Sequence, residues 1–307
     1  MEVPRVYAAH SVAPKREPAG EPDAPDLVVV GAASRDITPD DPRGWRLGGS
    51  ATYCSLTAAR LGLRVGCLLG VDAEAAVADE LSLLEAAGVD LRRVALERGP
   101  VFENIERNGH RRQRWLSECA PLAPAALPEA WRGARGWLLV PIAGELPEQW
   151  SAAPAHGAAV GIGWQGMLRE FAADGWVRGI APEPSTLLEA SGLVVTSLDD
   201  LPSEATIGSL RALAPRATVV LTAGERGGVV VRTSGLTRYR AIPGAAVVDS
   251  TGAGDVFLAA LMVAWLLKGE PATSGTLRFA AAAASCVVEG PGLSAVPTLA
   301  QVAERLG

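Results

Sequence analysis

The chain has 307 residues, of which 49% are hydrophobic and 20% are charged, a balance typical of a well-packed globular protein. Its length suits one large α/β domain or two modest ones. A formal net charge of −6 argues against a general nucleic-acid-binding or anionic-membrane-binding surface, so we expect neither partner.

The four cysteines (Cys54, Cys67, Cys119, Cys286) are scattered and include no C-x-x-C pair. This spacing argues against a disulfide framework or a zinc site and favours small apolar residues in a reducing compartment. The three histidines form no metal-ligand pattern either. The sequence contains no recognisable signal peptide or membrane span, so we expect a cytoplasmic protein.

Residues 1–25 are rich in proline and predict a flexible tail before a single domain at residues 26–307. Strand and helix patterns alternate through that domain. The predicted strands are residues 27–31, 64–69, 137–141, 158–162, 192–196 and 218–221. The predicted helices are residues 51–61, 74–87, 146–150, 166–172, 185–190, 204–213, 256–268 and 273–289.

This alternation predicts a mostly parallel sheet with helices on both faces. Ligands of such sheets bind at the carboxyl ends of the strands. Four polar or glycine-rich segments follow predicted strands or apolar runs, at residues 31–36, 163–169, 222–226 and 249–255. We therefore expect these segments to meet at one crevice.

Residues 92–115 differ from their surroundings because they are charged and alternating, with Asn108-Gly109 at their centre. Asn-Gly between such runs predicts a β-hairpin. We expect a small β flap from residues 95–116, together with the polar loop at residues 36–47. A surface hairpin without a role and a flap over a substrate fit the pattern equally well.

The segment at residues 249–255 reads Asp-Ser-Thr-Gly-Ala-Gly-Asp and leads into a long helical pattern. The start of a helix offers free backbone N–H groups to an anion. Gly252 and Gly254 let a phosphate approach the backbone, and Asp255 is suited to act as a general base beside it. The same residues also suit an ordinary glycine turn before a helix.

Two further segments each have two interpretations. Residues 161–166 match G-x-G-x-x-G, but the bulky Trp164 inside the turn argues against a dinucleotide site. Gln165 and Arg169 then fit either polar substrate contacts or a solvated helix start. The loop after residue 221 fits either a nucleotide contact, with Arg226 offsetting phosphate charge, or a plain turn.

These segments, in this order and spacing, resemble the ribokinase-like (PfkB) carbohydrate kinases over residues 28–292. The segments that carry the resemblance are residues 29–36, 48–62, 65–72, 86–90, 221–227 and 249–255. The resemblance implies a three-layer α/β/α fold with a mostly parallel sheet and a small β flap. It also implies ATP-dependent phosphorylation of a hydroxyl group on a small molecule, with Mg²⁺ and in some members K⁺.

The resemblance also implies roles for individual residues. The implied catalytic residues are the base Asp255 and an anion hole formed by Gly252, Ala253 and Gly254. The implied nucleotide contacts are Thr222, Gly224, Arg226 and Thr251. The implied substrate contacts are Asp36, Gly48, Gly49, Gln165 and Arg169. Asp249 is the candidate for a monovalent-cation site, and Asp200 for a contact to Mg²⁺ through water.

Two departures from the family pattern bear on the substrate. Tyr53 stands where family sugar kinases often carry Asn, and Ser-Leu-Asp-Asp at residues 197–200 replaces the usual Asn-x-x-Glu element. Residues 102–104, 111–113 and 164–169 look more like the branch that includes myo-inositol kinases. The leading expectation is a kinase of a polyol, cyclitol or sugar. The alternatives are a nucleoside kinase and a non-catalytic nucleotide- or sugar-binding regulator, and we expect a monomer or a homodimer.

Overall fold

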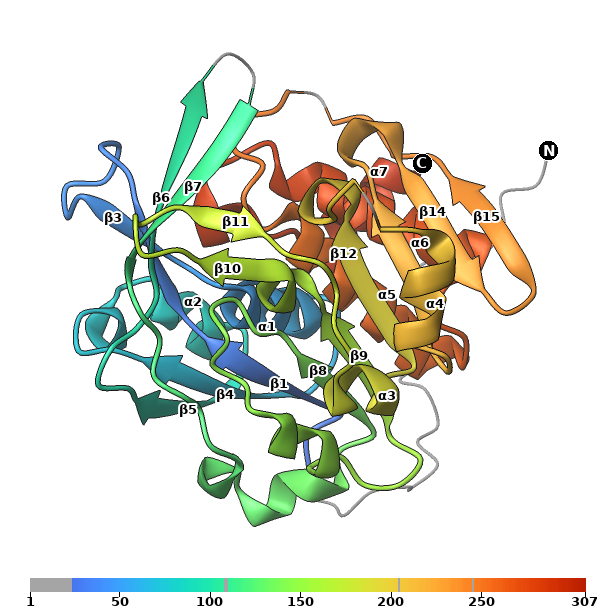
Figure 1. Cartoon of the computed structure of the whole chain (residues 1–307), viewed down its shortest axis with the longest axis horizontal. Coiled ribbons are helices and arrows are strands. Elements are labelled where there is room, and N and C mark those ends of the chain that lie inside the picture. The colour runs from blue at the N-terminus through green and yellow to red at the C-terminus, as the bar shows by residue number, and fades with distance from the viewer. Residues whose placement is uncertain (1–23, 108–109, 204, 245) are drawn as a thin grey trace.

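A nine-stranded sheet runs through the part of the chain that the structure, a computed structural model, describes: residues 24–107, 110–203, 205–244 and 246–307 (Figure 1). Its order is β15 (Gly235–Tyr239), β14 (Gly228–Arg232), β13 (Thr218–Thr222), β12 (Leu193–Ser197), β9 (Ala159–Gly163), β8 (Gly136–Leu139), β1 (Leu27–Ala32), β4 (Val65–Val71), β5 (Asp90–Ala95). The strands from β13 to β5 are parallel, and β14 and β15 extend one edge as an antiparallel hairpin. The predicted tail lies outside the described residues except for its last two.

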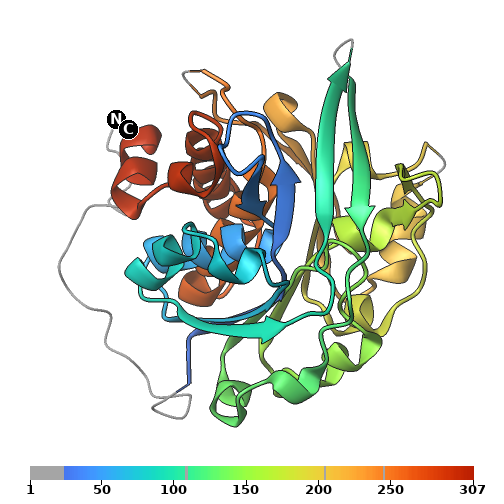
Figure 2. The same cartoon turned by 90° about the vertical axis from the view of Figure 1, so that its left-hand side faces the viewer.

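Every residue of β1 is buried, and successive residues enter two different cores. Leu27 and Val29 pack with the helices of one layer, whereas Val28 and Val30 pack with the other layer. The first layer contains α1 (Ser50–Arg60), α2 (Leu81–Ala86), α5 (Ala253–Lys268), α6 (Ser274–Val287) and α7 (Leu299–Leu306). The second contains α3 (Thr186–Ala190), α4 (Ile207–Leu213) and several 3-10 turns. Figure 2 shows the two layers on opposite sides of the sheet, so the predicted three-layer α/β/α fold is confirmed.

The flap is a second sheet that grows directly out of the first. Its strands lie in the order β3 (Trp45–Gly48), β2 (Ser34–Ile37), β6 (Val101–Arg107), β7 (His110–Ser117). Only Ala33 separates β2 from the end of β1, so the flap is anchored at the centre of the main sheet (Figures 1 and 2). Strands β6 and β7 form the predicted hairpin, and its Asn108-Gly109 turn lies outside the described residues.

The predicted helix at residues 166–172 is wrong. The chain instead forms the 3-10 turn η5 (Gln165–Leu168) and strand β10 (Arg169–Phe171), which pairs with β11 (Val177–Gly179). The ring of Phe171 lies 5.5 Å from that of Trp115 and 6.3 Å from that of Phe102, both on the flap. Contacts between segments so distant in the sequence override local helix preference.

Two other predicted helices form differently from the expectation. At residues 74–87 the 3-10 turn η1 (Ala75–Val77) is separated from α2 by the extended residue Ala78. Glu80 then turns toward the flap, where its carboxylate accepts hydrogen bonds from Arg43 and from the backbone amide of Leu47. At residues 146–150 the chain forms only the 3-10 turn η4 (Glu148–Ala152). None of the helices in the described ranges combines the length and apolar character that a membrane crossing requires.

Strand order reverses between β1 and β8, where the chain leaves β1 toward β4 and later returns on the other side. Ligands of open α/β sheets bind at such a point. The fully buried carboxylate of Glu145 lies at this point. It connects the end of β1 to the segment after β8 by accepting hydrogen bonds from the amides of Ala32, Ile142 and Ala143 at 2.8–3.1 Å. Burial raises the pKa of Glu145, and these amide hydrogen bonds oppose the shift.

We expect Glu145→Ala to lower the free energy of unfolding by about 3 kcal/mol or more, because it leaves buried amides without an acceptor. Glu129→Ala is the matched control, since the Glu129 side chain is 88% exposed and its ion pair is with Arg132 on the surface. Its cost should stay below about 1 kcal/mol. Denaturant unfolding of both variants at neutral pH measures the difference, and equal costs would contradict the structural role of Glu145.

Candidate active site

The N-terminus of α5 forms the centre of the candidate site. Gly252 precedes the helix in the left-handed conformation with φ of 79°, which is strained for any residue other than glycine. The Asp249 carboxylate accepts a hydrogen bond from the amide of Thr251 at 2.9 Å and so stabilises the turn. A side chain at Gly254 would meet no atom within 4 Å, so the backbone of this turn is open to an approaching group.

The ring of Tyr53, on α1, packs against this turn. A Cβ atom at Gly252 would lie 2.3 Å from Cε1 of the Tyr53 ring, so ring and backbone are in direct contact. The thiol of Cys54 also donates to the backbone carbonyl of Asp255 at 3.4 Å. These contacts fix the start of α5 against the start of α1.

The N-terminus of α1 meets the flap at a second pair of glycines. A Cβ atom at Gly48 would lie 2.3 Å from Oδ2 of Asp36, and one at Gly49 would lie 2.5 Å from the carbonyl oxygen of Ala32. Ser34 holds Asp36 from the other side, because its hydroxyl donates to Oδ1 at 2.8 Å. Gly48 and Gly49 therefore make room for the Asp36 carboxylate and for the crossing of the chain.

Asp200, Gln165 and Arg169 form a third group at the ends of β9 and β12. The amide nitrogen of Gln165 donates to both carboxylate oxygens of Asp200, at 3.1 and 3.2 Å. Arg169 forms an ion pair with Asp200 at 3.9 Å, and both side chains are largely buried. Gln165 and Arg169 are thus not solvated helix-start residues; they are bound to Asp200 inside the site.

Electrostatic interactions connect these groups to Asp255. Burial raises the pKa of the Asp255 carboxyl to about 6, with Asp200 and Asp36 adding to the rise. A hydrogen bond from the Ser50 hydroxyl and the positive charge of Arg169 act in the opposite direction. A carboxylate with this pKa is a stronger base than a solvent-exposed one and is still mostly ionised at neutral pH.

The buried hydroxyl of Tyr53 is affected by the same group of carboxylates. Burial raises the pKa of Tyr53 far above its usual range, and the negative charges of Asp36, Asp249 and Asp255 raise it further. The phenol therefore stays protonated among three carboxylates. Sequence reasoning placed Tyr53 only as a departure from the family pattern, and it did not identify Ser50 at all.

The predicted nucleotide contacts lie on a neighbouring strand end. Thr222 closes β13, lies directly beside Ser197 of β12, and its hydroxyl donates to the carbonyl oxygen of Thr196 at 3.4 Å. Gly224 has a φ of 55° and begins the 3-10 turn that carries Arg226, both of them exposed. Within the described residues, neither Gly224 nor Arg226 forms a hydrogen bond or ion pair with the groups around Asp255, so their nucleotide role stays a prediction.

Within the described ranges, no three His, Cys, Asp or Glu side chains form a ready-made metal cage. Mg²⁺ in phosphoryl-transfer sites is held by one or two carboxylates, waters and substrate phosphates, so the residues present fit such an ion without a cage. Asp200 is the carboxylate suited to hold it through water. Asp249 remains the candidate for a monovalent cation, although its Oδ1 already accepts a backbone hydrogen bond.

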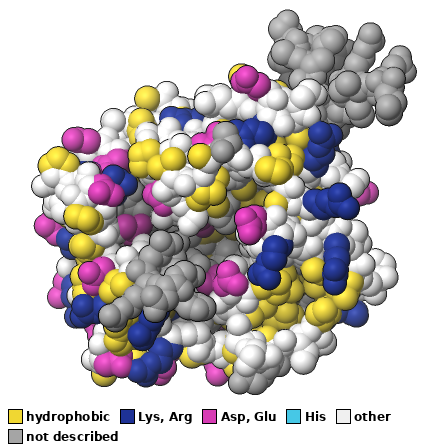
Figure 3. Space-filling model, turned by 90° about the horizontal axis from the view of Figure 1, so that it is seen from above, with side chains coloured by type: hydrophobic (Ala, Val, Ile, Leu, Met, Phe, Trp, Pro, Cys, Tyr) yellow, Lys and Arg dark blue, Asp and Glu magenta, His cyan; other side chains and the backbone are white. Residues whose placement is uncertain are grey.

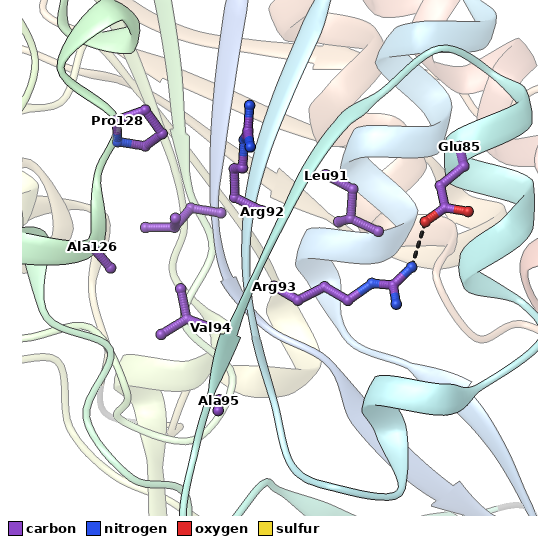
Figure 4. A pocket seen from close by; sticks show the side chains of 9 residues that line it. Glu85, Leu91, Arg92, Arg93, Val94, Ala95, Ala126 and Pro128 are labelled. Atoms are coloured by element: carbon purple, nitrogen blue, oxygen red, sulfur yellow. Dashed lines mark hydrogen bonds and ion pairs between the residues drawn. The ribbon is translucent and has the colours of Figure 1, made fainter.

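A separate groove of about 750 Å³ lies along the edge strand β5 and contains none of these residues (Figure 4). It runs between β5 and the segment that carries Ala126 and Pro128, with the Arg93–Glu85 ion pair at one side.

Acidic and basic side chains are interspersed on the face from which the flap projects (Figure 3).

Comparisons with known proteins bear on the family and the fold of this chain. Residues 189–299 match the sequence profile described as pfkB family carbohydrate kinase. No curated protein sequence matches the chain. A structure of a Methanocaldococcus jannaschii nucleoside kinase, "an Archaeal Member of the Ribokinase Family", superposes with a TM-score of 0.69 at 17% identity, covering 92% of this chain and 98% of that one.

Arabidopsis thaliana ribokinase complexed with ribose and ATP has a TM-score of 0.66 at 22% identity, over 92% and 99% of the two chains. A pyrophosphate-dependent kinase in the ribokinase family, complexed with a pyrophosphate analogue and myo-inositol, has a TM-score of 0.71 at 18% identity, over 91% and 98%. The chain has the ribokinase-like fold. The expected resemblance to the PfkB carbohydrate kinases is confirmed by the match over residues 189–299, and the kinase complexed with myo-inositol is among the proteins that share the fold.

The raised pKa of Asp255 has a consequence for stability. Because the folded protein binds this proton more tightly than the unfolded chain, stability falls as pH rises from about 4 to about 6 and stays lower above that range. We expect Asp255→Asn to be more stable than the wild type by about 1–3 kcal/mol at pH 7, with the difference disappearing below pH 4. Urea unfolding across this pH range tests it, with Asp79→Asn on the exposed surface as the control. A variant less stable at pH 7 would contradict the electrostatic assignment.

Proposed function

We propose that this protein transfers a phosphoryl group from ATP to a hydroxyl of a small polyol, cyclitol or sugar. The observation that carries the proposal is the position of Asp255, a carboxylate with raised pKa beside the open glycine turn of α5. The ribokinase-like fold and the match over residues 189–299, which includes this turn, support it.

Asp255 acts as the general base that removes the proton from the attacking hydroxyl. The backbone amides at the start of α5 bind the transferring phosphoryl group through the helix dipole and through those N–H groups that have no acceptor among the described residues, whereas the amide of Ala253 already donates to the carbonyl oxygen of Ser250 at 3.3 Å. Arg169 supplies positive charge near Asp255, which keeps the carboxylate ionised. Ser50 orients it by donating a hydrogen bond.

Asp36 positions the acceptor by accepting hydrogen bonds from its hydroxyls, on the floor formed by Gly48 and Gly49. Tyr53 fills the place where family sugar kinases often carry Asn, so the pocket differs from a ribose pocket. A cyclitol resembling myo-inositol is our leading acceptor. The myo-inositol complex among the structural neighbours supports this choice.

The phosphate donor binds where β13 ends and α5 begins. Thr222, Gly224, Arg226 and Thr251 are the proposed nucleotide contacts. Mg²⁺ held near Asp200 would neutralise the donor phosphates, and K⁺ is the candidate for Asp249. Pyrophosphate is the second candidate donor, because the neighbour that binds myo-inositol is pyrophosphate-dependent.

A panel of acceptors and donors tests the proposal. Myo-inositol and other cyclitols, linear polyols, pentoses, hexoses and nucleosides are each offered with ATP or pyrophosphate in the presence of Mg²⁺, and phosphorylated product is measured. We expect a cyclitol or polyol to be turned over most efficiently with ATP. Faster turnover of a nucleoside would establish a nucleoside kinase instead. ATP binding without turnover of any acceptor would favour a non-catalytic regulator.

Removal of the base tests the mechanism. Asp255→Asn should lower kcat by about two or more orders of magnitude while leaving ATP binding nearly unchanged, because the amide cannot accept the proton. The exposed control Asp79→Asn should keep wild-type turnover. Near-wild-type kcat in Asp255→Asn would contradict the assignment.

The pH dependence of the wild-type enzyme gives an independent measure of the same group. The base must be ionised, so kcat/KM should fall about tenfold per pH unit below about pH 6. A rate that stays constant down to pH 4.5, under conditions where the protein is folded, would exclude Asp255 as the base.

A further inference from the structure

The C-terminal helix α7 carries a guanidinium group that the proposed mechanism does not use. Nη2 of Arg305 donates to both carboxylate oxygens of Glu289 at 2.7 Å. Nη1 of the same group donates to the hydroxyl and the carbonyl oxygen of Ser285 at 3.0 and 3.3 Å, and to the carbonyl oxygen of Pro243 at 3.5 Å. A guanidinium bound at so many atoms fixes a geometry more sharply than an ordinary surface ion pair does.

The fold of α7 directs this side chain toward α6, against which α7 packs (Figure 1). Val302 is completely buried, and Arg305 lies three residues later on the same face of the helix. Thr298 and Gln301 form a capping box that fixes where α7 begins. The Arg305 charge therefore lies against the C-terminal end of α6, where the helix dipole favours a cation.

The chain that leads into the glycine turn of α5 lies on this same end of α6. We call the described residues 243–244 and 246–249 the entry segment. At its start, a Cβ atom at Gly244 would lie 3.1 Å from the carbonyl oxygen of Ser285 and 3.3 Å from Oε1 of Glu289. The start of the entry segment thus contacts the same two residues that bind Arg305.

The other end of the entry segment is bound to the end of α6 as well. The amides of Val248 and Asp249 both donate to the carbonyl oxygen of Val288, at 2.7 and 3.2 Å. The side chains of Val247 and Val248 are 74% and 62% exposed, so apolar burial does little to hold them. Asp249 in turn accepts the hydrogen bond from the Thr251 amide in the glycine turn. The position of that turn therefore depends in part on polar contacts with the end of α6.

We propose that Arg305 is a positioning residue of the donor site: by joining the end of α6 to Pro243, it fixes the entry segment and with it the turn that receives the donor phosphates. The inference rests on the proposed function, in which Thr251 and the amides of the turn contact the donor. Without Arg305 the entry segment is held less firmly against α6, and the donor binds more weakly. The acceptor is bound as before, because its proposed contacts lie on other segments.

The test compares Arg305→Met with Arg278→Met. Each change removes a guanidinium group that links α6 to α7 and retains a long apolar side chain. Arg278 is exposed, lies seven residues before Ser285 on α6 and donates to the carbonyl oxygen of Leu306. Isothermal titration calorimetry measures binding of ATP and of pyrophosphate in the presence of Mg²⁺. Hydrogen–deuterium exchange measures protection of the entry segment, and steady-state kinetics give kcat and KM for donor and acceptor.

We expect Arg305→Met to weaken donor binding and raise the donor KM about tenfold, the scale of a lost hydrogen bond that involves a charged group. The acceptor KM and the kcat at saturating donor should stay close to the wild-type values. Exchange should become faster at the amides of Val248 and Asp249. Arg305→Lys, which keeps a charged donor, should recover part of the loss. Arg278→Met should bind the donor and exchange as the wild type does.

Three results would overturn the proposal: unchanged donor binding in Arg305→Met, an equal loss in Arg278→Met, or unchanged exchange in the entry segment. An equal rise in the donor and acceptor KM would also overturn it, because Arg305 would then have a structural role only. If the wild type binds neither ATP nor pyrophosphate, the proposed function fails. Faster exchange confined to the entry segment of Arg305→Met would still support the hold of Arg305 on that segment, so the two failures are distinguishable.

Discussion

The structure depends on how one carboxylate is held where the starts of α1 and α5 meet. Asp255 is desolvated there and faces the negative charges of Asp36 and Asp200, which raises its pKa. The Ser50 hydroxyl and Arg169 limit that rise. The pKa reaches about 6 because burial and the neighbouring carboxylates outweigh the hydrogen bond and the guanidinium group, so the residues around Asp255 adjust its basicity as well as its position.

The surrounding charge is the physical reason for including a cation in the proposed reaction. The carboxylates of Asp36, Asp200, Asp249 and Asp255 gather around Tyr53 and the start of α5, whereas the guanidinium groups that oppose their effect on Tyr53 and Asp255 are those of Arg46 and Arg169, respectively. An ATP molecule adds further negative charge to a site already in excess of it. Binding of the donor as a metal complex reduces this repulsion, and K⁺ near Asp249 would reduce it again. The glycine turn alone, with partial charges from a helix dipole, is too weak to do so.

Local sequence patterns predicted the parallel strands and the long C-terminal helices because those elements bury regular apolar runs. The helix predicted at residues 166–172 was wrong because Phe171 is held by flap aromatics more than 55 residues away in sequence. The structural role of Glu145 was not predicted either, because a lone Glu in a sequence does not reveal that its carboxylate connects the end of β1 to the segment after β8. In the candidate site, Asp255 and Gly252 belong to one contiguous sequence motif, whereas Tyr53 and Ser50 reach them only through contacts that the fold creates: Tyr53 contacts Gly252 and Ser50 donates to Asp255.

The connection between the main sheet and the flap fixes where the flap lies relative to the candidate site. The proposed phosphoryl-transfer residues lie at the start of α5, which packs in the buried core. The flap instead contacts β10 through aromatic side chains. Because β2 continues directly from β1, the backbone itself sets the position of the flap relative to the candidate site.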